Sequence, residues 1–306
     1  MIATNFDYES CVRASEKIAW KLDDVFPPDL KLDFSRRFLP DSMSPTAELA
    51  FLDAGERLKL NQITGNAYLY LFYFVEEYII ASVLQHANAE VFGDPIELRS
   101  LLRFADEEVK HQQLFARFRS AFDRDFGAPC ALLENPQAVA EVILAKTPMA
   151  VLLTTLHIEL MTQQHYTESF REAEGKTIDP FFASLLKNHW LEESQHAKID
   201  ALELKKLADF ATVAQIDAAV ADYVDVLHAF AGLLATQAAL DVGNLEVAAG
   251  RTFTEAERAA IVEVQTHAYR RAFIVVGVQN ASFTKYLEQL SAGAPRRVAS
   301  HLGALS

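Results

Sequence analysis

Two eight-residue stretches decide the fold of this chain: FADEEVKH at residues 104–111 and HWLEESQH at residues 189–196. Each contains a glutamate followed three residues later by a histidine, namely Glu108 and His111, and Glu193 and His196. Residues three apart lie one above the other on an α-helix, so each pair can present a carboxylate oxygen and an imidazole nitrogen to one point. A metal ion fits such a point, at about 2.0–2.2 Å from each ligand atom. One Glu-x-x-His pair is a weak signal, whereas two pairs on apolar helix faces are a strong one.

Two further glutamate positions interrupt apolar runs upstream of these pairs. The run YFVEEYII (73–80) contains Glu76 and Glu77, and the run TTLHIELM (154–161) contains Glu159. The helical stripe of Glu76 is otherwise apolar, so we prefer Glu76 to Glu77 as the inward residue. The order Glu, Glu-x-x-His, Glu, Glu-x-x-His is the layout of carboxylate di-iron helix bundles. It predicts two similar halves that share a pair of metal ions.

The predicted ligands are polar residues on apolar faces. Four unpaired carboxylates in a core would be costly, and metal ions would neutralise them. The predicted metal ligands are Glu76 (or Glu77), Glu108, His111, Glu159, His189, Glu193 and His196. For Glu159 the alternative is a buried salt bridge. His189 lies four residues before Glu193 on the same face, so it is either a seventh ligand or a residue that supports one.

Two glutamates stand directly before a predicted ligand, Glu107 before Glu108 and Glu192 before Glu193. A metal-bound histidine usually donates its other N–H to a carboxylate or a carbonyl. Glu107 and Glu192 are therefore candidates to hold the histidine of the opposite half, with a surface charge as the alternative.

Helical periodicity dominates the chain and predicts an all-α fold. The predicted helices span about 8–25, 45–86, 95–126, 148–174, 180–210, 213–249 and 254–290, and we expect the tail from residue 291 to be loose. The four helices within 45–210 form a metal-binding four-helix bundle, and 211–290 supply additional helices. We expect residues 1–306 to be a single domain, because no linker separates these parts.

Composition excludes several classes of protein. The 306 residues include 28 Lys and Arg against 42 Asp and Glu, a net charge of −14, which argues against a nucleic-acid partner. The only cysteines, Cys11 and Cys130, exclude a disulfide framework and a Cys-based zinc site, so we expect a reducing, cytoplasmic location. The apolar stretches 67–84 and 149–161 both contain ionisable residues, so we predict no membrane span. We also see no signal-peptide pattern.

A family resemblance rests on the Glu108–His111 pair together with His189, Glu193 and His196. This pattern resembles the p-aminobenzoate N-oxygenase family of ferritin-like di-iron proteins, over about residues 62–200. The resemblance implies a ferritin-like bundle, a di-iron site that activates dioxygen, and an additional histidine ligand whose place His189 matches. It also implies oxidation of an amine to a hydroxylamine or nitro group, without identifying the substrate. Arg270 and Arg271 are candidates to pair with a substrate carboxylate, as a basic residue does in that family, although a solvated face is a second interpretation.

The predicted function is that of a non-haem di-iron oxygenase or oxidase. We expect two iron ions (or manganese in their place), dioxygen as co-substrate, a small-molecule substrate, and no catalytic residue apart from the metal site. The chain has no flavin motif or CxxC, so electrons come from an external donor; a homodimer is the oligomeric state to test. A ribonucleotide-reductase small-subunit type of radical protein would need a tyrosine near the first Glu-x-x-His, but Phe115 stands four residues after His111. A ferroxidase and a metal-free helical scaffold also compete with the predicted function.

Overall fold

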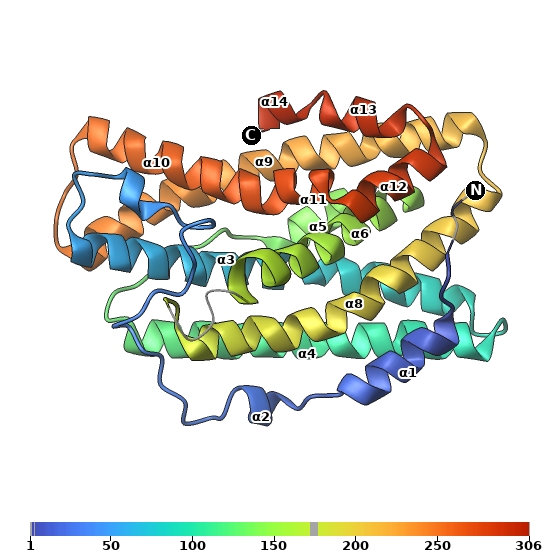
Figure 1. Cartoon of the computed structure of the whole chain (residues 1–306), viewed down its shortest axis with the longest axis horizontal. Coiled ribbons are helices and arrows are strands. Elements are labelled where there is room, and N and C mark those ends of the chain that lie inside the picture. The colour runs from blue at the N-terminus through green and yellow to red at the C-terminus, as the bar shows by residue number, and fades with distance from the viewer. Residues whose placement is uncertain (1, 3, 172–176, 306) are drawn as a thin grey trace.

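The computed structural model describes residues 2, 4–171 and 177–305, and its regular secondary structure is helical (Figure 1). Among these residues the only extended pairing is an isolated bridge between Arg37 and Ile178. The longer helices are α1 (Tyr8–Ile18), α3 (Ala54–Ala89), α4 (Pro95–Asp125), α5 (Pro136–Leu144), α6 (Pro148–His165), α8 (Pro180–Asp209), α9 (Val213–Ala249), α10 (Glu255–Arg270) and α12 (Ala281–Leu290). Shorter elements are α2 (Leu22–Val25), η1 (Thr46–Glu48), η2 (Tyr166–Phe170), η3 (Arg271–Val275), α11 (Val276–Gln279), α13 (Ala294–Ala299) and α14 (Leu302–Leu305).

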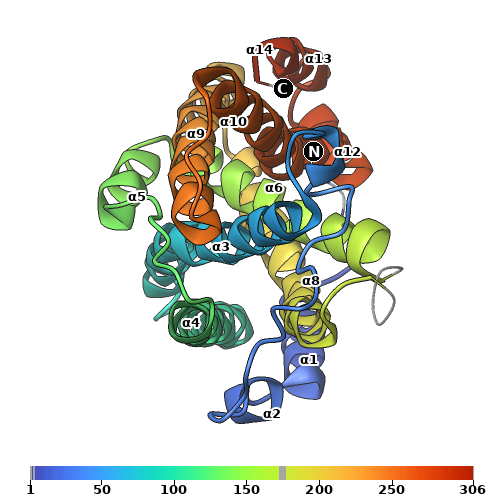
Figure 2. The ribbon, with the colours of Figure 1, turned by 90° about the vertical axis from the view of Figure 1, so that its left-hand side faces the viewer.

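The core of the molecule is a bundle of α3, α4, α6 and α8. Helix α3 packs along α4, and α6 packs along α8, which gives two helical pairs. Seen from the end, α1 and α2 cover the side of α4 and α8, while α9 and α10 cover the side of α3 and α6 (Figure 2). This is an all-α four-helix bundle with additional C-terminal helices, which confirms the predicted all-α bundle architecture.

Helix starts follow local capping chemistry. Helix α4 begins at a proline after the cap Asp94, and α8 begins at a proline after the cap Asp179, as the sequence predicted. The predicted start of the first bundle helix at residue 45 is wrong. The α3 helix begins only after Asp53, whose carboxylate accepts from the Glu56 N–H while the Glu56 carboxylate accepts from the Asp53 N–H. This capping box stops the helix from extending back toward Pro45.

Other predicted boundaries also need correction. The predicted helix 8–25 is divided after Ile18, where Ala19 adopts a positive φ of 22°. The predicted helix 254–290 is interrupted by a π-helical turn (Arg271–Val275) and by Asn280, whose side chain caps α12. The tail is partly helical rather than loose, and α5 was not predicted. The predicted end of the helix 148–174 lies outside the described residues.

Two helices, α3 and α9, are long and apolar enough to cross a membrane by length and composition. In α3, 72% of the most apolar window is buried inside the protein, and in α9 the share is 44%. Packing in the bundle therefore accounts for the apolar character of α3, and α9 packs on α3, α6 and α10. The absence of a membrane partner stays a prediction.

Candidate metal centre

All seven predicted ligands point into the interior of the four-helix bundle. Helix α3 supplies one glutamate, α4 a glutamate and a histidine, α6 one glutamate, and α8 a glutamate and two histidines. None of them is more than 3% exposed: Glu76, Glu108, His111, Glu159, His189, Glu193 and His196. The structure thus brings together side chains from positions 76 to 196 in one buried cluster.

One group of four potential ligands includes His189. Its Nε2 lies 2.6 Å from Glu193 Oε1 and 3.4 Å from Glu76 Oε1. His111 Nδ1 lies 3.3 Å from the same Glu193 oxygen. The ligand atoms of Glu76, His111, His189 and Glu193 all lie within 4.8 Å of one another, so they can hold one metal ion.

A second group lies beside the first and shares two of its members. His196 Nδ1 lies 2.9 Å from Glu108 Oε1 and 3.2 Å from Glu193 Oε2. The ligand atoms of Glu108, His111, Glu193 and His196 also lie within 4.8 Å of one another. Because the two oxygens of Glu193 face different groups, this carboxylate can bridge two ions.

Glu159 lies outside both groups of four but faces the same carboxylate. Burial raises the pKa of Glu159 well above its usual range, and the neighbouring Glu193 carboxylate raises it further. One carboxylate oxygen of Glu159 is buried with no hydrogen-bond partner. Its assignment as a ligand stays a prediction, and the structure places it where a metal bound to Glu193 would be within reach.

The choice between Glu76 and Glu77 follows from their orientation. Glu76 is 3% exposed and faces His189, whereas Glu77 is partly exposed and borders a surface hollow with Glu141. One residue along a helix is a rotation of about 100°, so only one of two neighbours can face the bundle axis. Glu76 is the inward residue.

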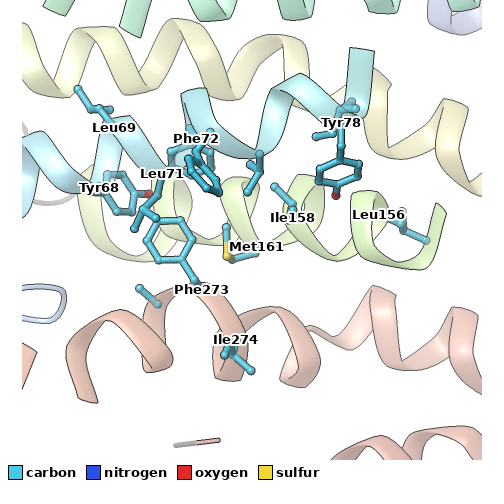
Figure 3. Packing of buried hydrophobic residues seen from close by; sticks show 14 of the residues in the cluster. Tyr68, Leu69, Leu71, Phe72, Tyr78, Leu156, Ile158, Met161, Phe273 and Ile274 are labelled. Carbon is cyan, nitrogen blue, oxygen red and sulfur yellow. The ribbon is translucent and has the colours of Figure 1, made fainter. Parts of the chain in front are cut away.

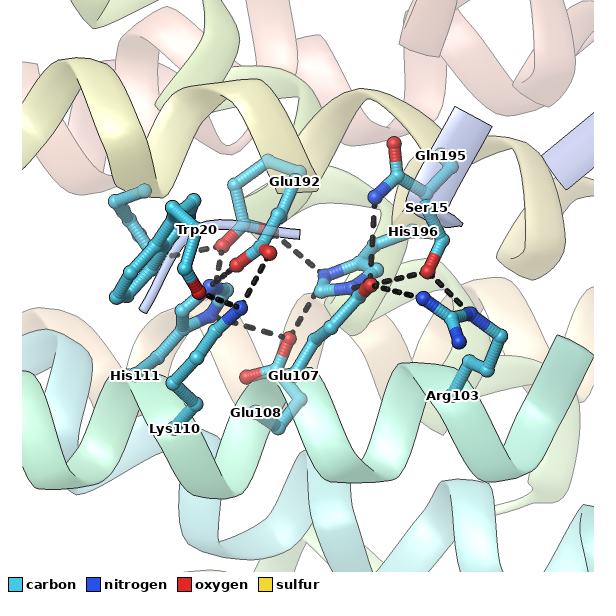
Figure 4. Close-up of polar contacts among 12 residues, drawn as sticks. Ser15, Trp20, Arg103, Glu107, Glu108, Lys110, His111, Glu192, Gln195 and His196 are labelled. Carbon is cyan, nitrogen blue, oxygen red and sulfur yellow. Dashed lines mark hydrogen bonds and ion pairs between the residues drawn. The ribbon is translucent and has the colours of Figure 1, made fainter. Parts of the chain in front are cut away.

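The two Glu-x-x-His histidines are held across the bundle (Figure 4). His111 Nε2 lies 2.9 Å from Glu192 of α8, and His196 Nε2 lies 2.9 Å from Glu107 of α4. This confirms the predicted exchange, in which each half supplies the glutamate that holds the histidine of the other half. The contact leaves each Nδ1 facing the cluster.

The two holding glutamates are themselves fixed. Lys110 donates to Glu192, and Ser15 donates to Glu107 (Figure 4). Burial is the largest single effect and would raise the pKa of Glu107, but the hydrogen bonds from His196, Ser15 and Gln195 and the charge of His196 together outweigh it and lower this pKa to about 2. Glu107 is therefore a stable anion, which orients the imidazole of His196 with its Nε2–H outward.

The cluster has the ligand types of a two-metal site, and several of its buried ligand atoms lack hydrogen-bond partners. Four carboxylates carry a formal charge of −4, which two divalent cations would balance. Burial raises the pKa of Glu76 to about 8, because a charged carboxylate is costly there without a cation. Several ligand atoms are buried without hydrogen-bond partners: Glu76 Oε2, Glu108 Oε1 and Oε2, and His111 Nδ1. Such atoms fit metal ligation better than a closed hydrogen-bond network.

Aromatic rings enclose the cluster and keep it dry. Phe72 and Phe115 contact the ring of His189 edge-on, with centroid distances of 5.2 Å and 5.1 Å. Phe104 stacks on His196 at 4.0 Å. On the outer side, Trp20 lies 5.9 Å from His111 in a stacked arrangement.

Sequence reasoning missed three residues near the cluster. Asp200 is 2% exposed and follows His196 by four residues, so extending the α8 stripe by one turn would have found it. Tyr78 follows Glu76 by two residues, and its buried hydroxyl has no hydrogen bond of normal geometry. Trp20 lies just beyond α1, inside the predicted helix 8–25, and nothing in the sequence indicated that it would approach His111.

The two candidate arginines lie on the C-terminal side of α10. Arg271 is exposed, and Arg270 is half-buried with its Nη2 3.4 Å from the Ala231 carbonyl oxygen. Their pairing with a substrate carboxylate stays a prediction. His165, next to Arg271 in a shallow hollow, is a buried structural residue hydrogen-bonded to Tyr68 and the Ala272 carbonyl.

No protein-family model and no curated protein matches the chain. Among solved structures the chain is similar to a variant of an R2-like ligand-binding oxidase with an anaerobically reconstituted Mn/Fe cofactor. The identity is 13% and the TM-score 0.38, over 90% of this chain and 94% of that chain.

Proposed function

We propose that the protein is a non-haem di-iron oxygenase that uses dioxygen to oxidise a small-molecule substrate. The observation that carries the proposal is the buried cluster of four carboxylates and three imidazoles, in which His111 and His196 are fixed by glutamates of the opposite half. A donor set rich in carboxylate suits iron that changes oxidation state and keeps open positions for oxygen. Manganese suits the same oxygen ligands, so the metal itself has to be measured.

Different residues would bind the metal ions, orient the histidine ligands and exclude water. Glu76 and His189 would hold one ion, Glu108 and His196 would hold the other, and Glu193, with one oxygen toward each group, would contribute to both. His111 would bind one of the two ions, because Nδ1 is its only free nitrogen. Bound iron would supply the redox chemistry and the affinity for dioxygen. Glu107 and Glu192 would keep the imidazoles oriented, and the surrounding phenylalanine rings would exclude water.

We further propose that the substrate is an amine and the product its hydroxylamine. The balanced step is RNH2 + O2 + 2e⁻ + 2H⁺ → RNHOH + H2O, in which an N–O bond forms and the second oxygen atom leaves as water. An external one- or two-electron donor supplies the electrons. The family resemblance supports this reaction, and the position of His189 within the cluster agrees with the extra imidazole of that family.

The test loads the purified protein with ferrous iron without oxygen, counts the bound iron, and then adds ¹⁸O2 with a panel of aromatic amines. We expect about two iron ions per chain and one ¹⁸O atom in the hydroxylamine, detected by mass spectrometry. Glu108→Ala and Glu193→Ala should each lose at least one iron, while Glu288→Ala, an exposed residue on α12, should keep both. Full iron content in both cluster variants would refute the proposal.

Tyr78 supports a second candidate, a protein that stores a tyrosyl radical. Burial raises the pKa of Tyr78 far above its usual range, and the carboxylates of Asp200, Glu159 and Glu108 add to the effect, so this ring lies close to the cluster. A radical protein would show a tyrosyl EPR signal after oxygenation that Tyr78→Phe removes. An oxygenase would show amine oxidation without such a signal.

A further inference from the structure

An apolar cavity of about 310 Å³ lies among α3, α5, α6, α9 and η3. Most of its wall is aliphatic or aromatic, including Val139, Ile143, Phe230, Leu233 and Phe273. An apolar cavity of about 150 Å³ is enough to bind benzene. This cavity therefore has room for a molecule of about two aromatic rings.

The cavity adjoins the metal cluster through its wall. Val75 and Ile158 line the cavity, and each directly precedes a cluster carboxylate, Glu76 and Glu159. Tyr78 also lines it and reaches from α3 toward α6 (Figure 3). The cavity and the cluster thus share parts of α3 and α6, and Tyr78 lies close enough to the cluster for Glu159 and Glu108 to act on its hydroxyl.

The polar groups of the wall are almost all engaged. His157 has both ring nitrogens occupied, at 2.6 Å from the Tyr223 hydroxyl and 3.0 Å from the Phe273 carbonyl oxygen. The Thr154 hydroxyl donates to the Ala150 carbonyl. The buried hydroxyl of Tyr78 lies beside Thr155 but makes no hydrogen bond of normal geometry, so it can turn to a polar group of a ligand.

Among the described residues, the mouth of the cavity offers no unpaired cation. The wall reaches the surface at Val142, which is 56% exposed, and at the exposed Asp225. The single cation there, Lys146, lies 3.0 Å from Asp225 and 3.6 Å from Asp222. Lys146 is thus already engaged by two carboxylates, so an anionic group in the apolar cavity would be desolvated without a partner, which disfavours an anionic ligand.

We infer that this cavity is the substrate site and that it takes a neutral aromatic amine of about two rings, not an amine that carries a carboxylate. The assignment as substrate site rests on the proposed function; the selection for a neutral ligand rests on the cavity alone. The rings would lie against the apolar wall, and the nitrogen would pair with the Tyr78 hydroxyl on the side of the cluster. A neutral ligand would leave the Lys146 ion pairs intact.

The first test compares two fluorescent probes that differ by one sulfonate. 1-Naphthylamine has two rings and is neutral at pH 7, and 5-amino-1-naphthalenesulfonate is its anionic counterpart. In fluorescence titrations of the full-length, iron-loaded protein without oxygen, we expect the neutral probe to bind at least about tenfold more tightly. Equal affinities for the two probes would overturn the inference.

The second test uses matched variants of α9. Leu233→Trp fills the cavity and should weaken binding of the neutral probe at least about tenfold, whereas Val247→Trp, on an exposed position of the same helix, should not. Ala229→Trp repeats the block from the exposed rim, in case the larger change at Leu233 disturbs folding. Unchanged binding in both blocking variants would place the probe elsewhere and overturn the assignment.

The third test reverses the charge at the mouth. Asp225→Lys should improve binding of the anionic probe about fivefold at low ionic strength, with the neutral probe unaffected. Asp217→Lys makes the same change in net charge at an exposed position of α9 outside the cavity wall and is the control. An equal gain in the two variants would show that net charge, not the mouth, governs binding.

Metal analysis of the same samples separates this inference from the proposed function. A protein that binds two iron ions and oxidises amines, but does not bind the neutral probe in the cavity, refutes only the substrate assignment. A protein that binds the probe as described but no iron refutes the oxygenase, and with it the substrate role, while the selective ligand cavity stands.

Discussion

At the scale of single residues, the pair Glu76 and Glu77 shows how one step along a helix separates a cluster carboxylate from a surface charge. Glu76 faces His189 in the bundle, and Glu77 borders a surface hollow. Because the two residues are chemically identical neighbours, they are matched controls for each other.

We expect Glu76→Gln to weaken metal binding and Glu77→Gln to leave it unchanged. The amide keeps the shape of the side chain but removes one of the negative charges that attract the cation. Iron content after dialysis should fall by about one ion per chain in Glu76→Gln only, measured by elemental analysis. Loss of iron in Glu77→Gln instead would show that Glu77, not Glu76, is the ligand.

The second residue-scale prediction concerns His165, which is buried and neutral. Its Nε2 donates to the Ala272 carbonyl, and its Nδ1 accepts from the Tyr68 hydroxyl. Burial lowers the pKa of His165 from 6.5 to about 4. The unfolded chain therefore binds a proton at this residue between pH 6.5 and 4, while the folded protein does not.

Stability should accordingly be complete above pH 6.5 and decline as the pH falls toward 4, with His165 contributing on the order of 3 kcal/mol. His165→Gln keeps an N–H for the Ala272 carbonyl and has no titrating group. Urea unfolding at several pH values should give a flatter dependence in this window for the variant. Identical slopes for the variant and the unmodified protein would contradict a neutral buried His165.

At the scale of elements, the C-terminal helical segment is bent to fit the bundle. The π-helical turn at Arg271–Val275 presents the carbonyls of Ala272 and Phe273 to two histidines of α6. Just beyond it, Gly277 lies against His157, and a Cβ at this position would be 2.2 Å from the imidazole Nε2. The ring cannot move aside easily, because Tyr223 and Phe273 hold both of its nitrogens.

We therefore expect Gly277→Ala to destabilise the protein by about 2–3 kcal/mol through overpacking. Gly243→Ala is the matched control, because a Cβ in that part of α9 meets no atom within 4 Å. The control should stabilise the protein by up to about 1 kcal/mol, since alanine is the better helix former. Denaturant unfolding measures both changes, and a shift of the same sign in the two variants would contradict the close contact.

Sequence periodicity was sufficient for the bundle helices and their inward faces, because each face repeats over many turns. The helix ends and the breaks within helices depend on single contacts instead, which periodicity does not predict. The Ser44–Pro45 pattern resembles a helix start, yet the reciprocal bonds of Asp53 and Glu56 set the true one. The break at Asn280 likewise depends on a side chain that caps the next helix, which periodicity does not register.

In the site, too, the residues that follow a helical repeat could be predicted, whereas those placed by long-range packing could not. The spacing within α4 and α8 was enough to predict the cluster residues and the exchange of Glu107 and Glu192. Trp20 could not be predicted, because it approaches His111 from a segment 91 positions away with no repeat. The cavity near Tyr78 depends on how five elements meet, which no single stretch of sequence encodes.

At the scale of the whole molecule, the buried carboxylates link metal content to stability. Without cations, Glu76 and Glu159 have raised pKa values because burial and neighbouring carboxylates oppose their charge. Ions that bind only the folded protein stabilise it by mass action, by about 2.7 kcal/mol at one hundred times the dissociation constant.

We expect chelation to lower the melting temperature by about 5 °C or more, and added ferrous iron to restore it. Differential scanning calorimetry on metal-loaded and chelated samples measures the shift. The Glu108→Ala variant is the control, since it should melt at nearly the same temperature with and without iron. An unchanged melting temperature in the unmodified protein would argue against a metal site in the core.

The crossed bonds between His111 and Glu192 and between His196 and Glu107 also bear on how such a bundle could have originated. Each helical pair contains a Glu-x-x-His but takes the support for its histidine from the other pair. If the two halves descend from one duplicated hairpin, the ancestral hairpin could not have completed its own site. It would have needed a second copy of itself, so an ancestor no longer than one helical hairpin would have worked as a homodimer, and fusion would then have made a permanent chain out of that association.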